Sequence, residues 1–114
     1  MAKIYKIVSM DLWRQALAVG ALVGAPVDLA DGFIHFSNAD QVEETARRHF
    51  AGQENLMLLE VVAEELGSGL KYEISRGGAL FPHLYGTLVV SKVSHAWPLP
   101  QRADGDHDFM GLLS

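Results

Sequence analysis

Three short segments of the chain carry side chains that can do acid–base or anion-binding chemistry. The first is Gly32-Phe33-Ile34-His35-Phe36-Ser37, in which an imidazole and a hydroxyl stand two residues apart. Side chains alternate between the faces of a strand, so His35 and Ser37 point the same way. A histidine and a serine beside the start of a helix are suited to binding an anion or the hydroxyls of a sugar. The alternative is a buried histidine bonded to a backbone carbonyl.

The second segment is Glu73-Ile74-Ser75-Arg76-Gly77-Gly78. Two consecutive glycines permit a close approach of backbone to ligand. The guanidinium of Arg76 is a planar fork of donors that matches phosphate or carboxylate. We predict an anion-binding loop in which Ser75, Arg76 and Gly77 contact the ligand. A tight turn with a solvated arginine is the alternative.

The third segment, Phe81-Pro82-His83-Leu84-Tyr85-Gly86, places a histidine and a tyrosine among apolar residues. We expect Phe81 and Leu84 to enter the core and so to aim His83 or Tyr85 inward. The alternative is a loop that only fills space. Polar segments that adjoin apolar strands are where ligand pockets form. We therefore predict that His35, Ser37, Arg76 and His83 line one concave site.

Strands and helices must position these segments. Period-two alternation or short apolar runs predict strands over residues 3–8, 32–36, 56–62, 70–74 and 88–93, of which 56–62 is the candidate central strand. Gly- and Pro-containing stretches predict loops over 21–32 and 75–85.

Two helices are predicted in the N-terminal half. Ser9 is the expected N-cap of the first, and Gly20 its end. Its apolar face holds Leu12, Trp13, Ala16, Leu17 and Ala18. The second opens at a capping-box pattern in residues 37–40 and stops at Gly52. Its inner face holds Val42, Thr45, Ala46, His49 and Phe50.

The predicted strands and helices indicate an α+β protein, and its length fits one domain. The chain has 114 residues, of which 49% are apolar, enough for a core without a disulfide or metal. We expect residues 1–100 to form the domain and 101–114 a polar C-terminal tail, whose end at 109–113 docks on it. The state expected is a monomer or weak oligomer.

Several functional classes are excluded by composition. There is no cysteine, so thiol catalysis and cysteine-based metal sites are ruled out. The His and Asp residues lack metal-ligand spacing, and no metal site is predicted. The net charge of −5 disfavours nucleic acid as a partner. No signal peptide and no apolar run of about 18 residues is present. We therefore expect a cytoplasmic protein that neither spans nor binds a membrane.

The motifs together resemble the small bacterial family known as DUF952, which has no assigned activity. The resemblance covers residues 3–97 and is carried by I-Y-K-I-V-S, Trp13, D-G-F-I-H-F-S, H-F-A-G and S-R-G-G-x-L-F-P-H-L-Y-G.

The order of motifs is also similar to the NAD-binding lobe of RNA 2′-phosphotransferases, within the ADP-ribosyltransferase-like fold. That resemblance implies split small sheets that hold NAD in a cleft. Under it, His35 contacts the ribose, Arg76 the phosphate, and His83 or Tyr85 positions the nicotinamide side. Lys6 stands where the phosphotransferases have a histidine that helps to hold the cofactor.

An ADP-ribosyl transfer passes through a positively charged sugar, which a carboxylate stabilises. Glu73 is the nearest candidate in the sequence. The lobe that binds RNA has no counterpart here, so the partner expected is a small nucleotide or anionic metabolite. Three hypotheses stay open: an enzyme or former enzyme that binds NAD or a related nucleotide, a non-catalytic module for a small anion or a protein, and a purely structural domain.

Overall fold

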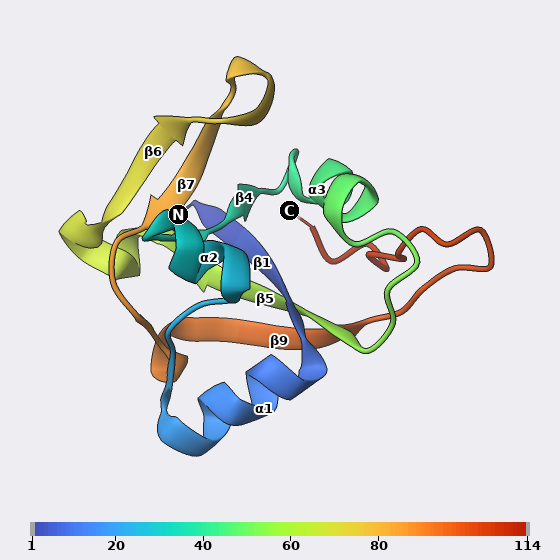
Figure 1. Cartoon of the computed structure of the whole chain (residues 1–114), viewed down its shortest axis with the longest axis horizontal. Coiled ribbons are helices and arrows are strands. Elements are labelled where there is room, and N and C mark those ends of the chain that lie inside the picture. Colours follow the sequence, from blue (N-terminus) through green and yellow to red (C-terminus); the bar gives the residue numbers. More distant parts are fainter. Residues whose placement is uncertain (1, 114) are drawn as a thin grey trace.

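A four-stranded antiparallel sheet forms the centre of the protein (Figure 1). The computed structural model describes residues 2–113, without the side chain of Arg76. The strand order is β4 (Ser37–Asn38), β1 (Lys3–Ser9), β5 (Leu56–Val62) and β9 (Val93–Leu99). All seven residues of β5 are buried, which confirms the prediction of a central strand. Apart from Glu60 the strand is apolar on both faces, because both faces are covered.

Two smaller sheets complete the β structure. One has the order β3 (Ile34–His35), β7 (Leu80–Leu84) and β6 (Leu70–Ile74), and its β6–β7 hairpin projects from the rest of the molecule (Figure 1). The other pairs β2 (Ala21–Leu22) with β8 (Leu88–Val89). With the helices, these sheets confirm the α+β class.

Three α-helices are described, all in the first half of the chain: α1 (Met10–Val19), α2 (Pro26–Asp31) and α3 (Val42–His49). Short 3-10 turns are η1 (Ala63–Gly69), η2 (Arg76–Gly78) and η3 (Val90–Lys92). The predicted caps of α1 are confirmed. The hydroxyl of Ser9 accepts a hydrogen bond from the amide of Leu12, and Gly20 ends the helix at a φ of 88° that suits glycine.

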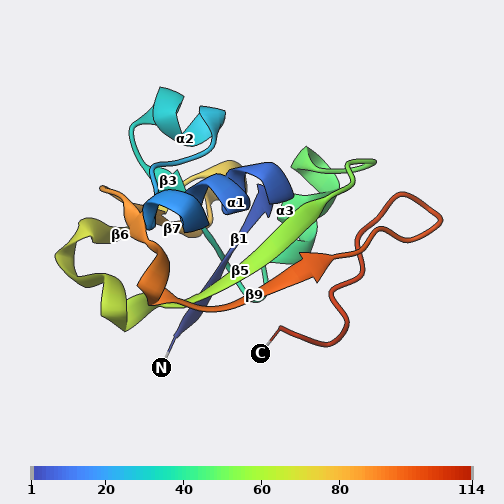
Figure 2. The same cartoon turned by 90° about the horizontal axis from the view of Figure 1, so that it is seen from below.

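The central sheet has a separate apolar core on each face. On one face α1 packs against β1 and β5 (Figure 2), with Trp13 and Ala16 buried beside Met57, Leu59 and Val61. On the other face lie α3 and the C-terminal segment, whose Phe109 is buried, as the docking of residues 109–113 predicts. The division into domain and tail stays a prediction. No helix among residues 2–113 is long and apolar enough to cross a membrane.

One continuous segment, residues 34–38, belongs to two sheets. Its first part, β3, pairs with β7 through Ile34↔Leu84 and His35↔His83. Its second part, β4, pairs with β1 through Tyr5↔Ser37 and its neighbours. The segment therefore leaves β1 beyond Tyr5 and joins the hairpin instead. The two sheets separate at this point, beside Lys6.

Several predicted boundaries are wrong. Residues 21–32 are not a loop but contain β2 and α2, so there are three α-helices where two were predicted. Residues 37–40 are not a capping box: Ser37 and Asn38 form β4, and α3 starts after Gln41. The expected loop 75–85 contains β7. The predicted strand 88–93 is β8 followed by η3, and the last long strand is β9. Leu17 and Ala18 do not join the inner face of α1, because Leu17 is 53% exposed and Ala18 is exposed as well.

The position of Trp13 in the core can be tested against Leu17 on the same helix. Trp13 is only 8% exposed, so Trp13→Ala should lower the free energy of unfolding by about 3–5 kcal/mol. Leu17→Ala should change it by less than about 0.5 kcal/mol. Urea titration followed by far-UV circular dichroism measures both. Equal losses would show that the face of α1 is wrongly assigned.

Candidate functional site

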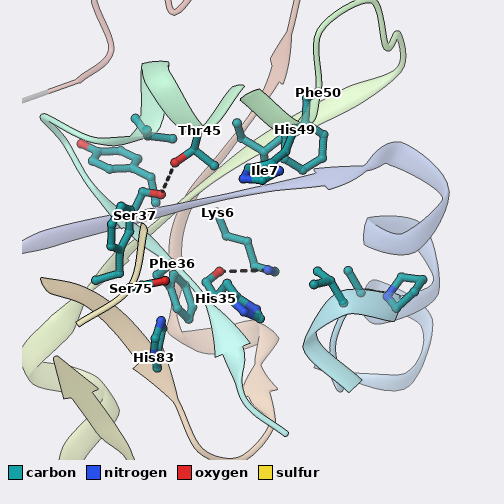
Figure 3. A pocket seen from close by; sticks show the side chains of 16 residues that line it. Lys6, Ile7, His35, Phe36, Ser37, Thr45, His49, Phe50, Ser75 and His83 are labelled. Atoms are coloured by element: carbon teal, nitrogen blue, oxygen red, sulfur yellow. Dashed lines mark hydrogen bonds between the residues drawn. The ribbon is translucent and has the colours of Figure 1, made fainter. Parts of the chain in front are cut away.

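A cavity of about 640 Å³ opens where the two sheets separate (Figure 3). Strand β1 and the 34–38 segment form its floor, α3 closes one side, and α2 and β7 close the others. Ligand pockets of ordinary size span roughly 300–1,000 Å³, so the cavity can hold a nucleotide-sized molecule. Its lining residues are Tyr5, Lys6, Ile7, Ala25, Pro26, Val27, His35, Phe36, Ser37, Val42, Thr45, His49, Phe50, Ser75, Phe81 and His83.

A buried ion pair supports the floor of this pocket. The ammonium of Lys6 lies 2.9 Å from a carboxylate oxygen of Asp28, and both side chains are almost fully buried. The same ammonium donates to the backbone carbonyl of His35 at 2.9 Å. Two of its three N–H donors are thereby used, which leaves one for a ligand.

Asp28 is the hub of the network. One oxygen accepts from the imidazole Nδ1 of His35 at 2.6 Å and from its amide at 3.1 Å. The other accepts from the amide of Ala25 at 2.8 Å and from Lys6. A Cβ at Gly24 would lie 2.8 Å from the Cβ of Asp28, so only glycine lets the chain close over this carboxylate. Asp28 thus ties α2 to β1 and β3.

Each member of the Lys6–Asp28 pair affects the pKa of the other. Burial alone would raise the pKa of Asp28. The hydrogen bond from His35 and the positive charge of Lys6 outweigh that effect and hold the pKa of Asp28 well below its usual range. Burial lowers the pKa of Lys6, and the negative charge of Asp28 opposes the shift.

His35 has both ring nitrogens engaged within the protein. Nδ1 faces Asp28, and Nε2 lies 2.9 Å from the carboxylate of Asp31. A carboxylate only accepts hydrogen bonds, so both bonds form when the ring carries both protons. His35 therefore offers the pocket a ring surface and no ring nitrogen without a protein partner.

His83 sits in a different environment. Its side chain is 5% exposed, and its Nδ1 lies 2.8 Å from the carboxylate of Glu73. The hydroxyl of Tyr85 donates to the same oxygen at 2.7 Å. The ring of Phe33 stacks on His83 at a centroid distance of 4.0 Å. Hydrogen bonds from His83 and Tyr85 lower the pKa of Glu73.

The sequence-predicted site residues divide into three groups. The pocket brings together Lys6, His35, Ser37, Ser75 and His83. Glu73, Gly77 and Tyr85 do not line it. Glu73 bonds to the lining residue His83, and Tyr85 bonds to Glu73. The side chain of Arg76 lies outside the described part of the chain, but its neighbour Ser75 lines the cavity.

The lining contains no carboxylate among the described residues, although the chain has 14 acidic residues and a net charge of −5. Lys6 and three imidazoles line the same space. Three acids bond to lining residues from outside the lining: Asp28 to Lys6 and His35, Asp31 to His35, and Glu73 to His83. The site is suited to an anion despite the acidity of the whole protein.

The sequence analysis missed Asp28 because it predicted a loop over residues 21–32. A signal was present. Proline at the first position of a helix and an acid in its first turn are typical of helix starts, and Pro26 and Asp28 fit both rules. No comparable signal marked Phe33 or Asp31. In the described part of the chain, no three metal-ligating side chains gather into a candidate metal site.

The fold and the pocket define a small α+β protein with a cavity between two sheets. The chain belongs to the family described as protein of unknown function (DUF952), whose model matches residues 7–96. This confirms the resemblance to DUF952 found in the sequence, while the similarity to RNA 2′-phosphotransferases stays a prediction.

Solved structures of protein CC0527 from Caulobacter crescentus, a structural genomics target, are similar to this chain. One crystal structure is 54% identical, covers 93% of each chain and has a TM-score of 0.91. A crystal structure of its double mutant is 52% identical, with 93% of each chain covered and a TM-score of 0.90. A solution NMR structure is 55% identical, covers 93% of this chain and 91% of that one, and has a TM-score of 0.84. No curated protein matches the chain.

Removing one member of the buried pair should be costly. Asp28→Asn leaves the Lys6 ammonium buried without its counter-charge, and should lower the free energy of unfolding by about 3–5 kcal/mol. Asp31→Asn is the matched control. It changes a half-exposed partner of the same histidine and should cost no more than about 1 kcal/mol. Guanidinium unfolding of both variants measures the difference, and equal losses would contradict the assignment of Asp28 as the hub.

The same pair predicts a pH dependence. A carboxyl whose pKa is lowered on folding stabilises the folded state above its unfolded value, and that stability is lost as pH falls below it. The stability gap between wild type and Asp28→Asn should therefore be full at neutral pH and shrink below the ordinary carboxyl value of 3.8. Unfolding free energies measured across the acid range test this. A gap that stays constant down to the lowest accessible pH would contradict it.

Proposed function

We propose that the pocket binds a nucleotide of the NAD or ADP-ribose class and that the protein transfers or hydrolyses an ADP-ribosyl group. The observation that carries the proposal is the lining itself, which among the described residues holds a cation and three imidazoles but no carboxylate, with walls of aromatic and aliphatic side chains. A molecule that combines phosphate with flat rings and sugar hydroxyls fits this chemistry.

The walls suit the rings of such a ligand. Phe36, Phe50 and Phe81 line the cavity, and Pro26 and Val27 of α2 line it from another side. Pockets that bind small molecules are mostly apolar, with a few polar groups that fix orientation. A base or nicotinamide ring would lie against these side chains.

The polar groups suit the rest of the ligand. The remaining N–H of Lys6 would donate to a phosphate oxygen. The hydroxyls of Ser37 and Ser75 line the cavity and would bond the ribose. The hydroxyl of Ser37 lies 2.9 Å from that of Thr45. Arg76 directly follows Ser75 in the sequence, and we propose that its guanidinium binds phosphate.

The resemblance to RNA 2′-phosphotransferases also supports the proposal. In that fold NAD lies in a cleft between split small sheets, and here a cavity opens where a four-stranded and a three-stranded sheet separate. Lys6, at the position of a cofactor-holding histidine, lines this cavity. The cytoplasmic location and the monomeric or weakly associated state stay predictions.

A second candidate function is binding without catalysis, of a small anionic metabolite. One observation favours it. A carboxylate that stabilises a positively charged sugar should face the ligand, yet Glu73 bonds His83 and Tyr85 and does not line the pocket. Turnover of NAD by the protein separates the two functions.

Substitution of Arg76 tests the phosphate contact. Arg76→Ala should weaken ADP-ribose binding by about ten- to a hundredfold, the cost of a charge-assisted hydrogen bond of about 1.5–3 kcal/mol. Arg76→Lys should recover only part, because an ammonium lacks the planar fork. Calorimetric titration alongside thermal melts measures binding and folding together. Arg14→Ala is the control, since Arg14 is exposed on α1, and it should change neither.

Two results would contradict the proposal. If wild type shows neither heat nor a melting shift with NAD, ADP-ribose or AMP at millimolar concentration, the pocket does not bind nucleotides. If it binds ADP-ribose but Arg76→Ala binds as tightly, the phosphate contact is wrongly assigned.

A further inference from the structure

His83 combines burial with one open ring nitrogen. Its side chain is 5% exposed, and its Nδ1 is bonded to Glu73. Figure 3 shows the His83 side chain among the residues that line the cavity. Because Nδ1 is bonded to Glu73, which lies outside the lining, we infer that the ring edge left for the pocket carries Nε2. Among the described side chains, Nε2 has no hydrogen-bond partner, yet it is not sealed from solvent. A nearly buried imidazole thus presents one unsatisfied nitrogen to the cavity.

The proton on this ring is placed by its partner. Hydrogen bonds from His83 and Tyr85 favour the ionised form of Glu73, and a carboxylate can only accept. Nδ1 must then be the donor. In a neutral imidazole with a proton on Nδ1, Nε2 carries the lone pair and accepts.

The orientation of the ring is fixed from two sides. Phe33 stacks on it, with an interplanar angle of 27°. Tyr85 donates to the Glu73 oxygen that His83 also uses, which holds that carboxylate in place. Carboxylate–imidazole pairs of this kind fix the tautomer and direction of catalytic and metal-binding histidines.

His35 shows the contrast within the same pocket. Both of its nitrogens face carboxylates, so it cannot accept a proton from a ligand while those bonds last. The two rings lie only 5.5 Å apart between centroids. His83 has one carboxylate partner, whereas His35 has two.

We propose that His83 is the general base of this pocket and that Glu73 is its positioning residue. This rests on the proposed function. An attacking water, or the hydroxyl of an acceptor, gives its proton to Nε2 as its oxygen bonds to the anomeric carbon of the ADP-ribosyl group. The glycosidic C–N bond of NAD breaks, and nicotinamide leaves with the bonding electron pair. The imidazolium so formed lies beside the Glu73 carboxylate and later releases its proton to solvent.

The first test needs no ligand. Long-range ¹H–¹⁵N correlation spectra of the histidine rings, recorded near pH 8, above the ordinary histidine pKa of about 6.5, report which nitrogen carries the proton. Wild type should show His83 with its proton on Nδ1. Glu73→Ala should move part of the population to the Nε2–H form. Glu65→Ala, a change at an exposed glutamate, should leave it unchanged. A wild-type ring protonated at Nε2 would overturn the proposal whatever the ligand is.

The second test measures NAD hydrolysis under single-turnover conditions. His83→Gln should lower the rate by about 10²- to 10⁴-fold, the usual contribution of a general base. Glu73→Ala should lower it less and alter its pH profile. A wild-type rate retained by His83→Gln would overturn the proposal. If wild type leaves NAD intact but shows the Nδ1–H tautomer lost in Glu73→Ala, the ADP-ribosyl reaction is wrong, and the assignment of His83 as the pocket's proton acceptor is supported.

Discussion

The buried contact between the ammonium of Lys6 and the carboxylate of Asp28 is the interaction on which the pocket depends. Residues 34–38 leave β1 at Lys6, and the carbonyl of His35 then has no backbone donor on β1. The Lys6 side chain supplies one. A lone buried ammonium is very costly, so the chain must bring a carboxylate to it. Asp28 of helix α2 provides this carboxylate. It contacts Lys6 of β1 and His35 of β3, and so links the two sheets on one side of the cavity.

This constraint explains the charge of the site. Asp28 and Glu73 are directed at protein cations or imidazoles, so neither contributes negative charge to the lining. An acidic protein can in this way enclose a cavity suited to an anion. It also gives the two histidines different roles. His35, held by Asp28 and Asp31, belongs to the framework that supports the floor. His83 is bonded through one nitrogen only, and the proposed function uses the other.

Much of the fold could be predicted because in some segments the hydrophobic pattern and the capping residues all favour the same element. The apolar run of β5 and the caps of α1 at Ser9 and Gly20 are of this kind. The errors lie where tertiary contacts decide. Pro82 suggested a loop, yet it lies in β7, the middle strand of its sheet. Its carbonyl accepts from the amide of Phe36 beyond the end of β3. Carbonyl and nitrogen of one residue face the same neighbour in an antiparallel ladder, so the missing N–H removes no bond to β6.

The members of the candidate site could be predicted in part, but their partners could not. Histidine, serine and lysine in strands are visible in the sequence, and Lys6, His35, Ser37, Ser75 and His83 all reach the cavity. What each of them does is set by partners distant in sequence or in an unrecognised helix. Spacing alone did not show that Glu73 would reach His83 across the β6–β7 hairpin, or that Asp28 would hold Lys6 and His35.

A double-mutant cycle at Lys6 and Asp28 tests the central claim most directly. The unfolding free energies of wild type, Lys6→Met, Asp28→Leu and the double variant give the interaction energy of the pair. Lys6→Met takes the ammonium from Asp28, Asp28→Leu leaves the Lys6 ammonium buried without a carboxylate, and the double change removes both groups. The structure predicts a double variant more stable than either single variant and an interaction energy of at least about 1 kcal/mol, within the range of residues in direct contact. Additive losses, with an interaction energy near zero, would contradict the account.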